Sequence, residues 1–346
     1  MSRSRRSLLI TALAGLLVAT ATTAAADPPA DQVVDDSFTA NDTTYTFRAV
    51  VPATVSEHPA MVVVVHGCQT TAVQQEQSIE LDPIARRDGF VVLYVDGSPL
   101  DTRQNRCWSG MLNPDGESRD SGDAAAVAGM TRLAADRYGV DPDRIYAVGM
   151  SSGAYETALL GGWFPDLYAA IGIHSGAPFA HGALGCLNLY LPTMSPEQLA
   201  AQAFSAQGAN TRVLPVVDFQ GDADTTVPQR CAQDTVEQWR LTDNLALAAH
   251  DDPDRIPALP ADTHDGVADT PGGHPFTVST WTLADRDCPV LQAWTIHGMD
   301  HFWSGGSPAP DAAPFTDPRG PNAAALAWDF FSRVQRTGDG YRCLPG

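Results

Sequence analysis

Short apolar runs constrain the fold of this chain more than any other feature of its sequence. Met61–Val65 consists only of Met and Val, comparable runs stand at Phe90–Val95 and Ile145–Val148, and a further strand is expected at Ala170–His174. Strands that are apolar on both faces are typical of a parallel sheet covered on its two sides. Segments with a helical pattern lie between these runs. The sequence therefore predicts an α/β fold with a mostly parallel central sheet and helices on both faces.

Helices are expected between these strands. Thr71–Arg87 and Asp120–Tyr138 are helical in pattern and end at Gly89 and Gly139, and a third helix begins near Ser152. The other expected elements are an antiparallel hairpin at Val33–Thr39 and Thr44–Val51, a helix begun by Ser195-Pro196-Glu197-Gln198, a strand at Val213–Phe219, a helix at Val227–Asp243, strands at Phe276–Leu283 and Val290–Ile296, a closing helix at Pro321–Gln335, and a surface loop at His250–Gly273.

The first 26 residues have the pattern of an export signal. Three arginines precede the apolar stretch Leu8–Ala19, and Ala24-Ala25-Ala26 offers a small-residue cleavage site. A stretch of 12 residues is shorter than the roughly 20 apolar residues that span a bilayer. We therefore expect a secreted protein whose signal peptide, residues 1–26, is removed after about Ala26. Both Sec and Tat export remain open. Residues 27–346 show no linker or repeat and are expected to form a single domain.

The charge balance argues against two classes of partner. Asp and Glu number 41 against 21 basic residues, which gives a formal net charge of −20. Such a surface repels phosphate backbones and anionic lipid headgroups, so we expect no nucleic-acid partner and no membrane partner. All the basic residues are Arg, so the chain lacks the lysine that a pyridoxal phosphate enzyme or a P-loop requires. The sequence leaves the oligomeric state open.

Six cysteines follow the signal segment, an even number that indicates disulfides in an exported protein. None has the C-x-x-C spacing of a structural zinc site, and no metal is expected. Cys68 and Cys107 lie in loops that follow neighbouring predicted strands, so we expect them to form a disulfide. The other predicted pairs are Cys231 with Cys288 and, by elimination, Cys186 with Cys343.

The segment Gly149-Met150-Ser151-Ser152-Gly153 stands between a predicted buried strand and a helix. In that setting G-x-S-x-G is typical of a nucleophile elbow, a tight turn that presents a serine at the end of a strand. The flanking glycines fit because there is no room for side chains beside the serine. We predict that Ser151 is a nucleophile, the alternative being a turn of small residues that only packs.

A serine nucleophile needs a base, and the base needs an acid that orients it. In this kind of fold the acid and then the histidine follow the serine along the chain, each after a later strand. Asp222 and Asp224 follow the strand that ends at Phe219, and His297 and His301 follow the last strand. We predict Asp224 as the acid, because Asp222 stands close to the strand end. We predict His301 as the base, because His297 still belongs to its strand.

Acyl transfer also needs N–H donors for the oxyanion that forms. The backbone N–H of Ser152, directly after the nucleophile, is one candidate. The loop His66-Gly67-Cys68-Gln69 follows the first buried strand and supplies the second donor, the N–H of Cys68 or Gln69. Gly67 would let the backbone turn toward the serine, although it could also serve only to end the strand.

Five segments carry a family resemblance as a set: HGCQ at 66–69, CW at 107–108, RIYAVGMSSGA at 144–154, GDADTTVP at 221–228 and GMDHFWSGG at 298–306. They resemble the poly(3-hydroxybutyrate) depolymerase-like esterases, which are secreted α/β-hydrolases related to feruloyl and acetylxylan esterases. The resemblance runs from about Tyr45 to Phe331 in the family's order. It implies the α/β-hydrolase fold, with Ser151 as nucleophile, Asp224 as acid and His301 as base.

The resemblance also implies hydrolysis of carboxylic esters without a cofactor, most of all of polyester or hydroxyalkanoate oligomers. Feruloyl or acetyl esters of plant cell walls are the alternative substrates. Asp300 stands where the family usually has Gly, which is expected to alter the loop beside His301. Polymer-degrading members often continue into a substrate-binding module. This sequence ends at Gly346, so efficient attack on solid polyester is not expected, while soluble oligomers and small esters remain open as substrates. Trp303 and Gln69 are predicted to contact the substrate, whereas Trp163 is expected to pack at a helix end.

The predicted reaction forms an acyl-enzyme on Ser151 and releases it with water, with His301 carrying the proton in both halves. A peptidase of the same fold, a metal-dependent hydrolase and a non-catalytic secreted binding protein remain alternatives. A fluorophosphonate separates the last of these, because it reacts only with an activated serine. A chelator separates the metal-dependent hydrolase.

Overall fold

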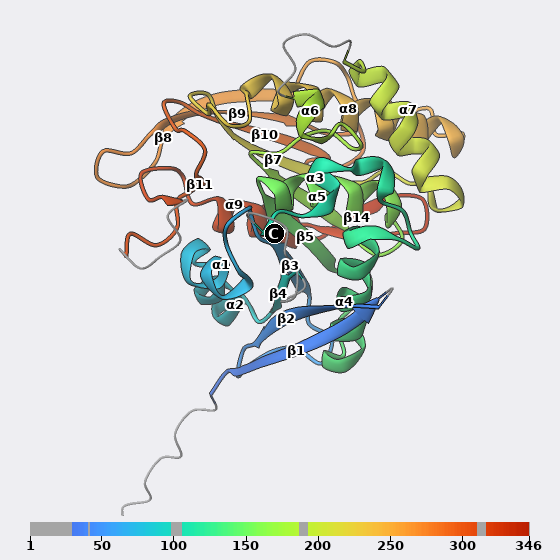
Figure 1. Cartoon of the computed structure of the whole chain (residues 1–346). Coiled ribbons are helices and arrows are strands. Elements are labelled where there is room, and N and C mark those ends of the chain that lie inside the picture. The colour runs from blue at the N-terminus through green and yellow to red at the C-terminus, as the bar shows by residue number, and fades with distance from the viewer. Residues whose placement is uncertain (1–29, 41, 98–105, 187–192, 310–315, 346) are drawn as a thin grey trace, which may run out of the picture.

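The computed structural model describes residues 30–40, 42–97, 106–186, 193–309 and 316–345. Within these residues ten strands form one sheet, which runs through the molecule in Figure 1. In spatial order the strands are β1 (Gln32–Ala40), β2 (Thr43–Val51), β4 (Val91–Asp96), β3 (Met61–Val65), β5 (Ile145–Met150), β6 (Ala170–His174), β7 (Val216–Gly221), β10 (Leu291–Ile296), β9 (Pro275–Trp281) and β8 (Asp262–Val267).

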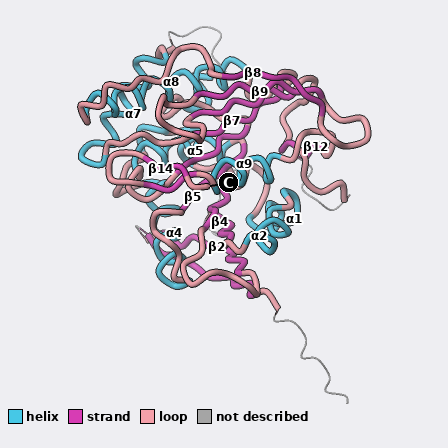
Figure 2. Tube along the Cα trace, turned by 180° about the vertical axis from the view of Figure 1, so that it is seen from behind, coloured by secondary structure: helices cyan, strands magenta, loops and turns pink. Residues whose placement is uncertain are grey.

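The sheet is parallel in its centre and antiparallel at both edges. Neighbouring strands from β4 to β10 are parallel. The hairpin β1–β2 lies beside β4 and the hairpin β8–β9 beside β10, so the two hairpins stand at opposite ends (Figure 1, Figure 2). Every residue of β3, β4 and β5 is buried, as in strands covered on both faces. The predicted mostly parallel α/β sheet is confirmed.

Two successive residues of β6 show how helices cover both faces of the sheet. Ile171 packs toward α5 (Ser152–Trp163), since a Cβ on Gly161 of that helix would lie 2.7 Å from its side chain. A Cβ on Gly172 would instead meet Phe331 of α9 (Ala323–Ser332) at 3.3 Å. The helices α4 (Gly122–Tyr138), α7 (Pro196–Gln207) and α8 (Gln229–Ala249) extend the layer of α5, while α1 (Ala72–Ile79) and α2 (Leu81–Asp88) lie with α9.

Several short elements connect the larger ones. The helix α7 begins as predicted, because Ser195 and Gln198 form a reciprocal capping box and Pro196 occupies the first turn. The short elements are α3 (Ser109–Leu112), α6 (Gly182–Cys186), the 3₁₀ turns Pro114–Gly116 and Gly208–Asn210, and the strands β11 (Trp303–Ser304), β12 (Thr316–Asp317), β13 (Val334–Arg336) and β14 (Tyr341–Cys343).

The single helix predicted over Thr71–Arg87 is wrong, because α1 and α2 are separate helices. Glu80 divides them and has a φ of 58°. The carbonyl of Ser78 accepts a hydrogen bond from the N–H of Ser307 at 2.7 Å, so it is used by a distant segment instead of the next helical turn. A contact between residues so far apart has no signature in the local pattern.

The predicted surface loop at His250–Gly273 is also wrong in part, because it contains β8. This edge strand pairs with β9 through its backbone, and nearly all its side chains are exposed. A strand without a buried face has no apolar alternation to reveal it. The strands β13 and β14, which follow the closing helix, were not expected either.

The three disulfides correct two of the predicted pairs. Cys68 is bonded to Cys107 as predicted, with 4.3 Å between the two Cα atoms. The pairs Cys231–Cys288 and Cys186–Cys343 are wrong, since the structure joins Cys186 to Cys231 and Cys288 to Cys343. Cys186 and Cys231 belong to α6 and α8, near the carboxyl ends of the parallel strands. Cys288 precedes β10 and therefore lies near the amino ends of the parallel strands.

The predicted signal peptide, residues 1–26, lies outside the described residues. Among the helices that are described, none is long and apolar enough to cross a bilayer.

Candidate active site

Ser151 lies in a sharp turn between β5 and α5. Its φ of 54° and ψ of −123° fall outside the regions that side-chain-bearing residues prefer. The N–H of Ser151 donates a hydrogen bond to the carbonyl of His174 at 3.0 Å, and this bond holds the turn. A Cβ on Gly149 would lie 2.1 Å from the Gly153 carbonyl oxygen, and a Cβ on Gly153 would lie 2.1 Å from that of Val65. Both glycines are therefore required for the strand and helix to approach so closely.

The structure brings Ser151, His301 and Asp224 into one hydrogen-bonded line. His301 Nε2 lies 2.9 Å from Ser151 Oγ, and His301 Nδ1 lies 2.7 Å from Asp224 Oδ2. The two candidates set aside above form a pair of their own, with 2.8 Å between Asp222 Oδ2 and His297 Nδ1. Of these two Asp–His pairs, the one formed by Asp224 and His301 reaches Ser151.

The carboxylate of Asp224 is fully buried and held by four hydrogen bonds. Its Oδ1 accepts the backbone N–H groups of Thr226 and Val227 at 2.8 and 2.7 Å, and its Oδ2 accepts Gln220 Nε2 at 3.1 Å as well as His301. A carboxylate accepts and does not donate, so the proton between it and His301 belongs to Nδ1. His301 Nε2 is then free to accept the proton of Ser151.

Asp300, the residue that differs from the resembled family, ties the histidine loop to the aspartate loop. Its Oδ1 accepts the N–H groups of Thr225 and His301 at 3.0 and 2.8 Å. These two backbone hydrogen bonds lower the pKa of the Asp300 carboxyl. The substitution therefore connects the two loops that carry His301 and Asp224.

Another histidine, His174, lies next to the Ser151–His301–Asp224 site and was not predicted from the sequence. It ends β6, its Nε2 accepts the N–H of Ser304 at 2.9 Å, and its ring stacks on Trp303 with 4.9 Å between centroids. Burial and then repulsion by His301 lower the pKa of His174 to about 3. His174 is therefore neutral near pH 7, with its proton on Nδ1 facing Ser175 Oγ. No local sequence motif marks His174, because its contacts depend on where β6 lies in the sheet.

The predicted oxyanion donors stand next to the nucleophile. Ser152 is the first residue of α5, where backbone N–H groups lack helical partners. A Cβ on Gly67 would lie 3.4 Å from the Cβ of Ser151, so the loop after β3 touches the nucleophile. Neither the N–H of Cys68 nor that of Ser152 bonds to another described residue. Gln69, the alternative donor, has a φ of 66°. These assignments stay predictions.

A cavity of about 370 Å³ lies beside Ser151 and is lined by Cys68, Gln69, Trp303 and His301, among others. Trp303 is only 1% exposed, so it both packs and lines the cavity. Trp108 does not line it. Trp163 packs against Phe179, as expected.

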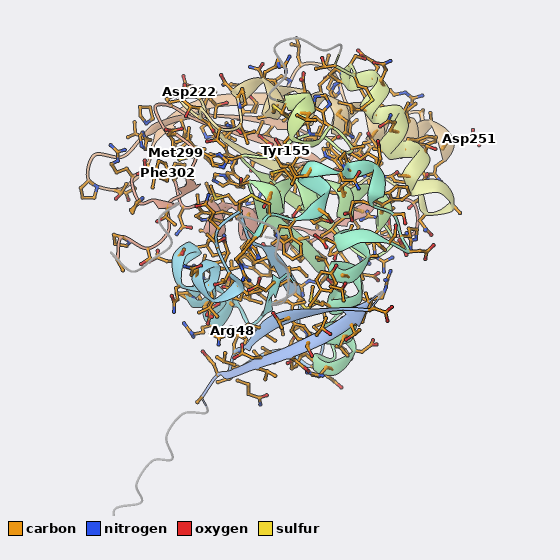
Figure 3. All side chains as sticks on the ribbon, in the orientation of Figure 1. Arg48, Tyr155, Asp222, Asp251, Met299 and Phe302 are labelled. Carbon is orange, nitrogen blue, oxygen red and sulfur yellow. A yellow bond between two sulfur atoms is a disulfide. The ribbon has the colours of Figure 1, made fainter. Side chains whose placement is uncertain are left out.

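Two polar residues of the cavity wall were not foreseen. Gln75 on α1 and Tyr155 on α5 are each 4% exposed and line the cavity, and no hydrogen bond joins either side chain to another described residue. Figure 3 shows Tyr155 near the middle of the molecule, with Met299 and Phe302 to one side. Within the described part of the chain no three His, Cys, Asp or Glu side chains are grouped so that they could hold a metal ion.

Comparisons with known proteins show the family to which the chain belongs. The family model described as "Esterase PHB depolymerase" matches residues 44–249. "Feruloyl esterase B" of Thermothelomyces thermophilus is 29% identical over 213 residues, which cover 58% of this chain and 70% of that protein. "Poly(3-hydroxyalkanoate) depolymerase C" of Paucimonas lemoignei is 26% identical over 263 residues, which cover 72% of this chain and 56% of that protein, just over half its length.

A solved structure supports the fold separately. The acetyl xylan esterase from Aspergillus awamori superimposes with a TM-score of 0.65 at 21% identity, covering 88% of this chain and 99% of that one. At that identity the likeness concerns the fold alone. The predicted α/β-hydrolase fold is confirmed.

Proposed function

Since this chain belongs to the Esterase PHB depolymerase family and is a carboxylic ester hydrolase, we propose that it is a secreted serine esterase that forms an acyl-enzyme on Ser151. The observation that carries the proposal is the line of hydrogen bonds from Ser151 through His301 to Asp224. This arrangement pairs a nucleophile with a base and the base with an orienting acid.

The proposed reaction proceeds in two halves. His301 Nε2 takes the hydroxyl proton while Ser151 Oγ attacks the ester carbonyl carbon, and the N–H groups of Cys68 and Ser152 hold the oxyanion. The C–O bond to the alcohol then breaks, and His301 returns the proton to the leaving oxygen. A water molecule repeats the sequence on the acyl-enzyme and releases the acid and free Ser151. Asp224 keeps the imidazole oriented and stabilises its charged form.

We propose soluble hydroxyalkanoate oligomers and small esters as the substrates. The family and the Paucimonas lemoignei relative support this class, and the cavity of about 370 Å³ suits a short ester chain. Gln75 and Tyr155 could donate hydrogen bonds to oxygen atoms of such a chain. The feruloyl and acetylxylan esterase relatives favour a second class, aromatic or acetyl esters of plant cell walls. Rates on 3-hydroxybutyrate oligomers, emulsified polyhydroxybutyrate, methyl ferulate and acetylated xylan would decide between these classes.

Export is part of the proposal. Residues 1–26 carry the signal pattern, and three disulfides pair all six cysteines, as in proteins of oxidising compartments. We propose residues 27–346 as the mature single domain. N-terminal sequencing of protein from the culture medium should begin near Asp27. Recovery only from the cytoplasm, with residue 1 intact, would refute export.

The matched variants Ser151→Ala and Ser152→Ala test the nucleophile. Ser151→Ala should lower kcat for p-nitrophenyl butyrate at least about 10,000-fold. Ser152→Ala removes a buried hydroxyl that has no partner in the described residues and keeps the backbone N–H, so its kcat should stay within about threefold. Retained activity in Ser151→Ala would mean that Ser151 is not the nucleophile. Failure of a fluorophosphonate to label the wild-type protein would contradict the proposal and favour a non-catalytic binding protein.

A further inference from the structure

We propose that His66 and Thr70 are positioning residues that orient the peptide unit between Gly67 and Cys68, so that the Cys68 N–H faces the reacting carbonyl. This inference rests on the proposed function, because it assumes that the Cys68 N–H stabilises an oxyanion. It assigns a task to two buried polar side chains that the proposed reaction does not otherwise use.

The carbonyl of Gly67 is held by two side-chain donors. His66 Nδ1 lies 2.7 Å from this oxygen and Thr70 Oγ1 lies 2.8 Å from it. Both side chains are buried. A trans peptide unit is planar, and its C=O and N–H point in opposite directions. Holding the Gly67 oxygen on His66 and Thr70 therefore fixes the direction of the Cys68 N–H, which is opposite to that oxygen.

The other ring nitrogen of His66 contacts a carboxylate. Its Nε2 lies 3.1 Å from Asp96 Oδ1, and Arg106 approaches the same carboxylate. Both ring nitrogens of His66 thus face oxygen atoms, and both contacts are hydrogen bonds when the ring carries a proton on each nitrogen, that is, as an imidazolium. Burial alone would raise the pKa of Asp96, but the hydrogen bond and charge of His66 and the charge of Arg106 outweigh it and lower that pKa. The carboxylate stays charged and keeps the imidazole directed at Gly67.

The neighbouring peptide units are held as well. The carbonyl of His66 accepts the indole N–H of Trp108 at 2.8 Å, and the disulfide joins Cys68 to Cys107. Glycine gives little resistance to rotation of its peptide units. Rotation of the unit after Gly67 would place a carbonyl oxygen where negative charge develops and would remove one donor at once. Loss of one such donor costs on the order of 100- to 1,000-fold in kcat.

Thr70 offers a matched pair of variants, because valine has the shape of threonine without its hydroxyl. Thr70→Val should lower kcat about tenfold with KM within about twofold, since one of two restraints is lost. Thr70→Ser keeps the donor and should stay within about threefold of wild type. His66→Phe with Thr70→Val should approach the full loss of an oxyanion donor, on the order of 100-fold or more.

A second readout separates positioning from a general structural effect. An alkyl trifluoromethyl ketone forms a tetrahedral adduct on the serine, whereas the product carboxylate binds without one. In Thr70→Val the inhibition constant of the ketone should rise by the same factor as kcat falls, and that of the product should not change. Equal weakening of both ligands would overturn the inference.

Different experimental results would overturn the positioning role of His66 and Thr70 and the proposed function. Wild-type kcat in Thr70→Val, with Ser151→Ala inactive, would overturn the inference and leave the serine esterase intact. Activity in Ser151→Ala would overturn the proposed function whatever Thr70 does. If the His66 variant does not fold, the Thr70 pair still decides the matter, because Thr70→Val changes neither size nor charge.

Discussion

At the scale of single residues, the site depends on which of two similar Asp–His pairs meets the serine. Asp224 is buried under four hydrogen bonds and reaches His301, whereas Asp222 is partly exposed and reaches His297. The side-chain chemistry of the two pairs is the same. Burial and contact with Ser151 distinguish them.

This difference predicts opposite results for two identical substitutions. Asp224→Asn should lower kcat on the order of 1,000- to 10,000-fold, because the amide no longer holds His301 in the reactive tautomer. Asp222→Asn should leave kcat within about twofold. Steady-state kinetics with p-nitrophenyl butyrate measure both. Equal losses in the two variants would mean that the acid is wrongly assigned.

The buried neutral His174 predicts a stability change with pH. Its pKa falls from 6.5 in the unfolded chain to about 3 in the folded one. Between these pH values the unfolded state binds the proton and the folded state does not, so this contribution to stability is complete above about pH 6.5 and is lost as the pH falls toward 3. His174→Gln removes the titrating group.

Urea unfolding at pH 7 and pH 4.5 measures this contribution. The free-energy difference between wild type and His174→Gln should be larger at pH 7 and should shrink by on the order of 1 kcal/mol or more at pH 4.5. The same difference at both pH values would mean that His174 does not titrate as its burial implies.

Of these residues, Ser151, Asp224 and His301 could be predicted, because each follows a strand in the order that the fold requires. The backbone N–H groups of Cys68 and Ser152 stay predicted oxyanion donors that follow from this assignment. His174, Gln75 and Tyr155 could not be predicted. They stand at ordinary positions within a strand or helix and reach the site only through the packing of distant segments.

At the scale of elements, the contact between α5 and the strands β3 and β5 positions the nucleophile. The two glycines of the elbow permit it, since a side chain at either would overlap backbone atoms that cannot move aside. This part of the fold is readable in advance, because the local geometry of the turn demands glycine. The break at Glu80 and the strand β8 are not, since each depends on hydrogen bonds to remote backbone.

Gly153→Ala tests this contact. The new methyl group would lie 2.1 Å from the Val65 carbonyl oxygen, so α5 must shift, at a cost of about 3 kcal/mol. We expect a lower Tm and a lower kcat, measured by calorimetry and ester hydrolysis. Gly338→Ala is the control, because nothing lies within 4 Å of its added Cβ. Equal Tm values for the two variants would refute the close approach.

At the scale of the whole molecule, the parallel strands at the centre of the sheet bring three loops together at their carboxyl ends. Ser151 follows β5, Asp224 follows β7 and His301 follows β10, and these strands lie close together in the sheet. Residues 150 positions apart therefore come within hydrogen-bonding distance. That convergence was predictable from the alternation of strands and helices. The pairs Cys186–Cys231 and Cys288–Cys343 were not predictable, because spacing along the chain does not tell whether a cysteine lies at the carboxyl or the amino ends of the parallel strands.

The acyl-enzyme itself tests the central claim most directly. Wild-type enzyme mixed with p-nitrophenyl butyrate and quenched in acid within milliseconds should carry one butyryl group, and peptide mass spectrometry should place it on Ser151. His301→Ala, treated in the same way, should carry none. An acyl group on another residue, or full turnover without any covalent adduct at the shortest quench times, would contradict the account.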